Sequence, residues 1–289
     1  MESFYTPEEI ATQLKIHVQT VLNYIKDGKL KAVKLEKGYR ISASDFNDFV
    51  YGSRDIKTPE DRLLQLDPQK KYKSLRKTSI EPVDKMAISI PNFKLDKLLE
   101  EASVKDRQGY RAYPFPALSL MAEDQQRLSD GVLFKKESIG GEFFFSFAST
   151  RGKLLTAESL WEDANSRFEN SIGLLTSIGI MYRGLLFIPR YYSMVPFEGE
   201  VNYSFSITNP SGRKLSMDSD RPVVWYGNYI STTEEPIIVQ RKIKTSITSD
   251  EVREIVFDMV KEFLWYFKCE LREDVIKGRI EEIAKNIIG

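Results

Sequence analysis

The stretch TPEEIATQLKIHVQTVLNYIKDGKL, residues 6–30, carries the local signals of two short helices separated by a tight turn. Thr6 followed by Pro7 and Glu9 is typical of a helix start, because the threonine and glutamate side chains can satisfy free backbone donors there. Apolar residues then recur at helical spacing up to Leu14, as on the buried side of an amphipathic helix. We therefore predict a first helix that begins just after Thr6.

A second helix is predicted over Val18–Lys26, with its valine, leucine and isoleucine side chains directed inward. The pair Asp27-Gly28 ends this helix, because glycine readily adopts the left-handed conformation found at helix termini. Two short helices joined by a tight turn make the helix-turn-helix arrangement.

The next residues predict a small β-hairpin, or wing. A run in which lysine partly alternates with apolar residues is followed by the turn residues EKG and by the return segment YRI. Residues 42–51 then predict a third short helix with its aromatic side chains facing inward. Residues 1–51 are thus predicted to form a winged helix-turn-helix domain.

Residues 4–51 resemble the excisionase/MerR-type winged helix-turn-helix. The resemblance is carried, in chain order, by Thr6-Pro7-Glu8-Glu9-Ile10-Ala11, Leu14, Val18-Gln19-Thr20-Val21, Gly28-Lys29-Leu30-Lys31-Ala32-Val33, Tyr39-Arg40-Ile41 and Asp45-Phe46. It implies binding to double-stranded DNA, with the second helix in the major groove. It also implies that Arg40 and the wing tip touch the DNA backbone or the minor groove.

The side chains predicted to face outward supply groups that recognise DNA. Glutamine and asparagine can bridge the edge of adenine, threonine can meet a phosphate or a thymine methyl group, and lysine and arginine meet phosphates. His17 is predicted to cap the second helix, to contact a phosphate at its start, or to be solvated. The candidate DNA-binding residues are His17, Gln19, Thr20, Asn23, Tyr24, Lys26, Lys34, Lys37, Tyr39 and Arg40.

Residues 52–84 are polar and charged, contain three prolines and have few aromatic residues, which is typical of a linker. One short helix is predicted within them, at residues 60–66. Residues 85–289 then predict an α+β domain with a mainly antiparallel sheet and terminal helices. Strands are predicted at residues 131–136, 142–148, 182–192, 200–209, 222–231 and 237–245, and helices at residues 156–174 and, after a capping box that begins at Thr248, at the carboxyl end.

The second domain shows no motif of a known chemistry. It has no phosphate-binding loop and no dinucleotide-binding turn, and the only histidine of the chain lies in the first domain. The cluster Asp218-Ser219-Asp220 is either an exposed loop or a cation site, and Cys269 is predicted to be a buried, inert thiol. We therefore predict no enzyme activity, no cofactor and no metal site.

Composition narrows the possible functions. Basic and acidic residues are equal at 42 each, which argues against a protein held on DNA by bulk charge and leaves room for a local basic patch. A single cysteine excludes an internal disulfide framework. The amino terminus has no signal-peptide pattern and no apolar run reaches the ~18 residues of a membrane span. We therefore expect a soluble cytoplasmic protein with no membrane partner.

Three functions remain besides that of a protein-binding adaptor. The first is a sequence-specific transcriptional regulator whose second domain forms a homodimer or senses a ligand or partner. The second is an architectural accessory factor for recombination, plasmid maintenance or a mobile element. The third is an effector enzyme, such as a nuclease, that the helix-turn-helix directs to DNA and that would need an acidic metal cluster on the second domain.

Overall fold

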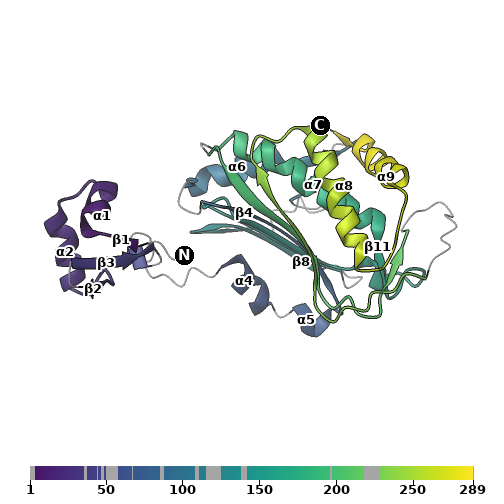
Figure 1. Cartoon of the computed structure of the whole chain (residues 1–289), viewed down its shortest axis with the longest axis horizontal. Helices are drawn as coiled ribbons and strands as arrows, with labels where there is room; N and C mark the ends of the chain where they lie inside the picture. The colour runs from purple at the N-terminus through teal and green to yellow at the C-terminus, as the bar shows by residue number, and fades with distance from the viewer. Residues whose placement is uncertain are drawn as a thin grey trace. The chain divides into compact units, whose positions relative to one another are not determined.

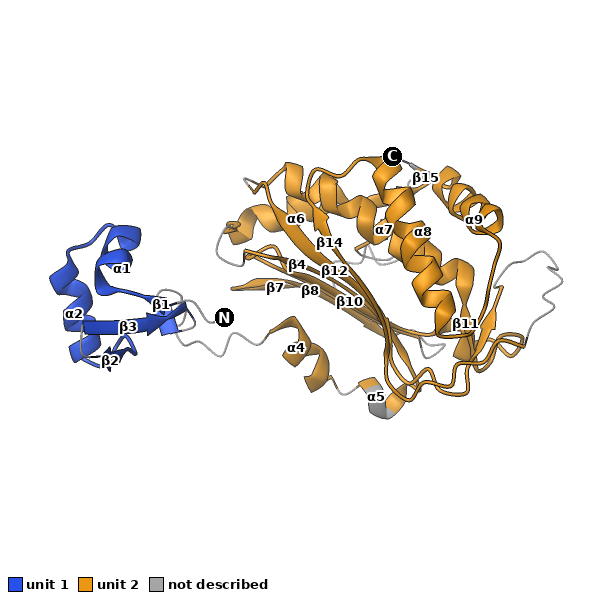
Figure 2. Ribbon diagram, viewed as in Figure 1, with its two compact units in different colours: residues 1–57 blue, residues 58–289 orange. Residues whose placement is uncertain are grey.

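The chain falls into two compact units, Met1–Lys57 and Thr58–Gly289 (Figure 1, Figure 2). The smaller unit contains the predicted helix-turn-helix. The computed structural model describes residues 4–35, 38–43, 45–46, 49, 58–66, 68–84, 88–107, 111–114, 125–137, 142–195, 197–217 and 228–288.

The smaller unit consists of two helices and a small sheet. The helices are α1 (Pro7–Leu14) and α2 (Val18–Lys26), and α2 has the bounds that its sequence predicts. The sheet has the strand order β1-β3-β2, with β1 at Phe4–Tyr5, β3 at Gly38–Ser42 and β2 at Val33–Leu35. Strands β2 and β3 form the predicted hairpin.

The capping box predicted at the start of α1 is present. The backbone N–H of Glu9 donates to Thr6 Oγ1 at 3.3 Å, and the backbone N–H of Thr6 donates to Glu9 Oε2 at 2.7 Å. The small core of this unit includes the buried residues Ile10, Val21, Leu30, Ile41 and Phe46. Local signals and core positions therefore agree in this unit.

The larger unit is built on an antiparallel sheet of seven strands in the order β14-β12-β4-β10-β9-β8-β7. The predicted α+β class with a mainly antiparallel sheet is confirmed. The strands are β4 (Leu75–Pro82), β7 (Gln125–Leu128), β8 (Gly131–Glu137), β9 (Phe143–Ser149), β10 (Leu154–Ser159), β12 (Glu200–Ile207) and β14 (Ile237–Lys244).

Helices cover both faces of this sheet, but unequally (Figure 1). One face packs into the main core under α6 (Asn92–Ala102), α7 (Leu174–Ser193), α8 (Ser249–Trp265) and α9 (Glu273–Lys285). The other face carries a smaller core that includes Leu63 of α4 (Pro59–Gln65), which is followed by α5 (Pro68–Lys71). The remaining elements are β5 (Val104–Asp106), β6 (Arg111–Tyr113), the 3₁₀ helix η2 (Trp161–Ala164), β11 (Ser171–Gly173), β13 (Lys214–Ser216) and β15 (Ile287–Ile288).

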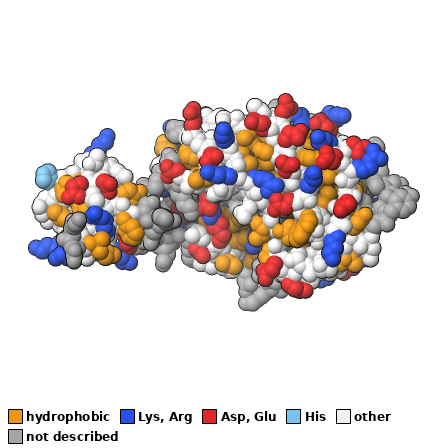
Figure 3. Space-filling model, viewed as in Figure 1, with side chains coloured by type: hydrophobic (Ala, Val, Ile, Leu, Met, Phe, Trp, Pro, Cys, Tyr) orange, Lys and Arg blue, Asp and Glu red, His pale blue; other side chains and the backbone are white. Residues whose placement is uncertain are grey.

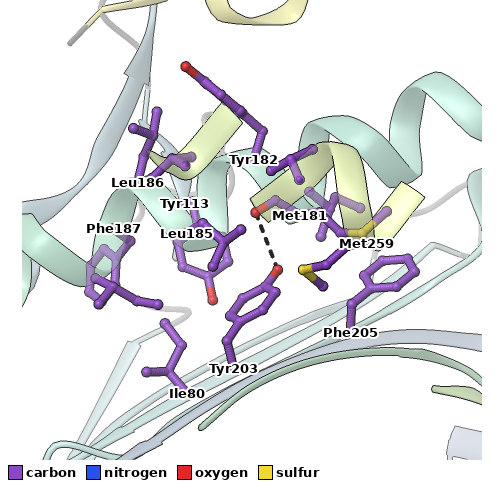
Figure 4. Packing of buried hydrophobic residues seen from close by; sticks show 14 of the residues in the cluster. Ile80, Tyr113, Met181, Tyr182, Leu185, Leu186, Phe187, Tyr203, Phe205 and Met259 are labelled. Carbon is purple, nitrogen blue, oxygen red and sulfur yellow. Dashed lines mark hydrogen bonds between the residues drawn. The ribbon is translucent and has the colours of Figure 1, made fainter. Parts of the chain in front are cut away.

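Helix α7 lies close against the centre of the sheet. Tyr203 of β12 points up to the helix, and its hydroxyl donates to the carbonyl oxygen of Met181 at 3.4 Å (Figure 4). A Cβ atom on Gly184 would lie 2.7 Å from the Tyr203 hydroxyl oxygen, so only glycine allows this approach. Although α7 has 20 residues, no helix in the described part of the chain combines the length and apolar character of a membrane span.

The predicted linker at residues 52–84 needs correction. Its second half contains β4, which pairs with β10 on one side and β12 on the other, near the middle of the sheet. The strand looks like a linker because its inward positions include Arg76 and Thr78, which are polar. Both are buried, and each finds a polar partner inside the protein.

Two further elements differ from prediction. Residues 156–174, predicted as a helix, form most of β10, then η2 and β11, while residues 182–192, predicted as a strand, lie within α7. Strand β10 has apolar residues on both faces, which hides its alternation, and α7 is buried on nearly all sides, which hides its helical stripe. The four other predicted strands that lie within the described residues are confirmed, as are the two terminal helices. The strand predicted at residues 222–231 lies mostly outside them.

Candidate nucleic-acid interface

Three residues join α1 to α2. Lys15 takes a left-handed conformation, with φ at 54°, and its N–H reaches the carbonyl oxygens of Ala11 and Thr12. His17 then caps α2, because its Nδ1 accepts the backbone N–H of Gln19 at 3.2 Å. The predicted capping role of His17 is confirmed, while its contact with a phosphate stays a prediction.

One side of α2 is exposed and polar. Gln19, Asn23 and Lys26 are exposed, whereas Val21 is fully buried. Since an α-helix turns about 100° per residue, positions 19, 23 and 26 lie along one line on the helix surface. Gln19 Nε2 donates to Asn23 Oδ1 at 3.3 Å, so two amide groups lie together on this surface.

Thr20 and Tyr24 lie together on one side of this line and are half-buried. The ring of Tyr24 packs against Phe49, with the ring centroids 4.9 Å apart. Tyr24 was predicted to face outward, but part of its ring supports the unit instead. Its remaining surface and the Thr20 side chain lie at the edge of the exposed amide line.

The hairpin distributes its candidate residues over two faces. Lys34 pairs with Tyr39 and Val33 pairs with Arg40 in the antiparallel register. Directly opposed residues share a face of the sheet and successive residues alternate. Lys34 and Tyr39 therefore lie on one face, and Arg40 lies on the other with the exposed Val33. Lys37 lies outside the described residues.

Positive charge is concentrated around α2 and the hairpin. Between Lys15 and Arg40 the sequence has seven basic and two acidic residues, although the whole chain is balanced. On the visible face of the larger unit, basic and acidic side chains are interspersed (Figure 3). The local excess lies where phosphates would flank an inserted helix.

The larger unit contains the side chains that the sequence suggests as candidates for metal binding or reactivity. Among the residues that the structure describes, no three His, Cys, Asp or Glu side chains are grouped so that they could hold a metal ion. The Asp218-Ser219-Asp220 cluster lies outside the described residues. Cys269 is buried as predicted, and burial raises the pKa of its thiol to about 11, which keeps it protonated at neutral pH.

One polar cluster escaped prediction. It lies on the face of the sheet that α7 covers, where Arg76 and Glu162 are buried and paired, and Arg183 of α7 lies near them. The available signal was an arginine within the apolar run around residue 183 and charged residues at inward strand positions, which composition alone does not separate from solvated charges.

Comparison with known proteins identifies a related family for the smaller unit alone. A family model described as a helix-turn-helix domain matches residues 4–51. No curated protein and no solved structure matches the chain. The match covers α1, α2 and the hairpin, and it supports DNA as a binding partner of this unit.

Proposed function

We propose that this protein is a sequence-specific DNA-binding regulator of transcription. The observation that carries the proposal is the exposed line Gln19, Asn23 and Lys26 on α2 of a helix-turn-helix unit. The major groove admits a helix and presents a different pattern of donors and acceptors for each base pair. An amide pair at the centre of the helix surface suits adenine, and Lys26 at its end suits a phosphate.

In this proposal the hairpin acts as a basic wing. Lys34 and Tyr39 on one face and Arg40 on the other would touch the two sides of a groove as the hairpin lies along it. Lysine and arginine contacts to phosphates fix the position of a protein on DNA, whereas contacts to base edges select the sequence. The hairpin would thus contribute affinity and orientation, and α2 would contribute selectivity.

Selection of bound duplexes from a random library tests the proposal directly. With the full chain at about 0.15 M salt, we expect enrichment of a short motif that contains adenine at the position opposite α2. Binding without enrichment of any motif would show an architectural role through the phosphate backbone. No binding at low salt would contradict the DNA-binding function itself.

We further propose that the larger unit assembles a homodimer and senses a ligand or partner, without catalysing a reaction. A single small helix-turn-helix usually gains affinity by doubling, because two half-sites multiply the contacts. Equilibrium sedimentation of the full chain should then give twice the chain mass of 33.4 kDa. The selected DNA should contain two half-sites about one helical turn apart. A monomer that binds a single half-site would contradict the dimer.

A further inference from the structure

A small polar cavity lies between α7 and the centre of the sheet in the larger unit. Its volume is about 40 Å³, and its polar lining comes from β4, β6, β10 and α7. The lining includes the side chains of Arg76, Thr78, Tyr113, Thr156, Glu158 and Arg183. One water needs roughly 10–15 Å³ on this measure, so the space holds a group of a few atoms and no large ligand.

Three hydroxyl groups meet at this cavity. Thr78 and Thr156 are direct partners in the register of β4 and β10, and their Oγ1 atoms are hydrogen-bonded. The Tyr113 hydroxyl lies 3.3 Å from Thr78 Oγ1. Burial raises the pKa of Tyr113 to about 12, so this hydroxyl keeps its proton at neutral pH and remains a donor.

Arg76 already has two carboxylate partners. Its Nη2 donates to Glu162 Oε1 at 2.6 Å, and its Nη1 donates to Glu158 Oε1 at 3.2 Å. Glu162 Oε1 also accepts the backbone N–H of Gly173 at 2.7 Å. These hydrogen bonds hold Arg76 and its two glutamates in place, although Arg76 Nε and Glu162 Oε2 are buried without a hydrogen-bond partner.

Arg183 differs because no described residue pairs with it. Its guanidinium lies over Gly179, where a Cβ atom would come within 3.2 Å of Arg183 Nη1. Arg183 Nε is buried with no hydrogen-bond partner, and no carboxylate of the described residues forms an ion pair with it. Burial lowers the pKa of Arg183, and the negative charge of Glu158, which forms no ion pair with the guanidinium, opposes this shift.

We propose that this cavity binds the carboxylate group of a small monoanionic ligand, with Arg183 as its counter-ion and the hydroxyl groups beside it as donors. The planar guanidinium matches a carboxylate with two parallel hydrogen bonds. A phosphate group carries about −1.5 to −2 charges at neutral pH, and Glu158 in the cavity lining would repel it more strongly than a monoanion. The proposal gives the sensing role of the larger unit a ligand class and does not depend on DNA binding.

Thermal unfolding of the full chain in acetate or formate, compared with chloride at equal ionic strength, tests this site. At a carboxylate concentration tenfold above Kd we expect the Tm of the larger unit to rise by about 3–6 °C. Saturation-transfer NMR on the acetate methyl and formate protons reports binding separately from stability. Phosphate forms the third arm and should leave the Tm close to its value in chloride.

The variant Arg183→Gln should lose both responses. In chloride its Tm should stay close to that of the wild type, because the removal of a charge without an ion pair is offset by the lost attraction to Glu158. Arg190→Gln is the matched control, since Arg190 lies on the same helix but outside the cavity lining. Tyr113→Phe keeps the ring and removes one donor, and it should weaken acetate binding at least threefold if Arg183→Gln does not fold.

Three results would overturn the assignment. Carboxylate responses that survive in Arg183→Gln would place binding elsewhere. A lower Tm of Arg183→Gln in chloride, together with no carboxylate response of the wild type, would make Arg183 a structural residue. A response to phosphate larger than that to acetate would show that the ligand class is wrong. None of these results bears on DNA binding, which the selection experiment tests separately.

Discussion

Replacing Asn23 with alanine is expected to weaken the preference of the chain for its DNA motif while the smaller unit stays folded. Asn23 is exposed, and its side chain accepts one hydrogen bond, from Gln19, which is itself exposed. Alanine also favours the helix more than asparagine does. Each bidentate contact between an amide side chain and a base is worth about 1–3 kcal/mol of discrimination, which corresponds to a loss of roughly 5- to 150-fold in specific affinity.

Arg40→Ala should act differently, because a phosphate or minor-groove contact adds affinity rather than sequence preference. We expect it to weaken binding to all sequences and to lower the slope of log K against log salt by about one. The double variant Asn23→Ala/Arg40→Ala should show no specific complex in a gel-shift titration. Gln13→Ala, which removes an exposed amide from α1, is the control. Specific binding by the double variant at wild-type affinity would refute the assigned interface.

Helices α1 and α2 and the hairpin of the smaller unit could be predicted because their signals are local. A capping threonine, a glycine after α2, where φ is 69°, and a short turn each act within a few residues. Burial then follows from helical spacing, so the exposure of Gln19 and Asn23 was predictable as well. Predicting that the hairpin residues lie on two different faces requires the strand register, which depends on pairing across the turn.

The larger unit was predictable where one face of an element meets solvent. Strand β14 alternates between buried and exposed residues over most of its length and was predicted correctly. Alternation disappears when both faces of a strand are covered, as in β10, and the helical stripe disappears when a helix is enclosed, as in α7. Strand β4 was not predicted for a further reason. Its buried polar residues are hydrogen-bonded to residues from distant segments of the chain, which the local sequence does not reveal.

The cavity could not be found from the sequence for the same reason. Thr78 and Thr156 become neighbours through the register of two strands, and Arg183 reaches them from a helix further along the chain. Each residue alone is as ordinary as any solvated polar residue. These polar groups come together only when β4, β10 and α7 pack against one another in the fold.

Removing Glu162 is expected to have the largest effect on stability. Glu162 is fully buried, Arg76 is 1% exposed, and Glu162 Oε1 accepts hydrogen bonds from Arg76 and from the Gly173 backbone. Loss of one partner of a buried pair leaves a charge in a medium that solvates it poorly, which costs about 3–5 kcal/mol. Glu162→Ala should therefore lower the free energy of unfolding of the larger unit by about this amount, with Glu158 retaining part of the interaction with Arg76.

Urea unfolding followed by tryptophan fluorescence measures this loss selectively, because all three tryptophans, at positions 161, 225 and 265, belong to the larger unit. Glu169→Ala is the matched control. Glu169 pairs with Lys73 at 3.9 Å, both side chains are more than 60% exposed, and such a pair contributes about 0–1 kcal/mol. If Glu162→Ala were no more destabilising than this control, Arg76 would have to find its charge partners elsewhere. The polar residues of β4 would then need another explanation for their place in the middle of the sheet.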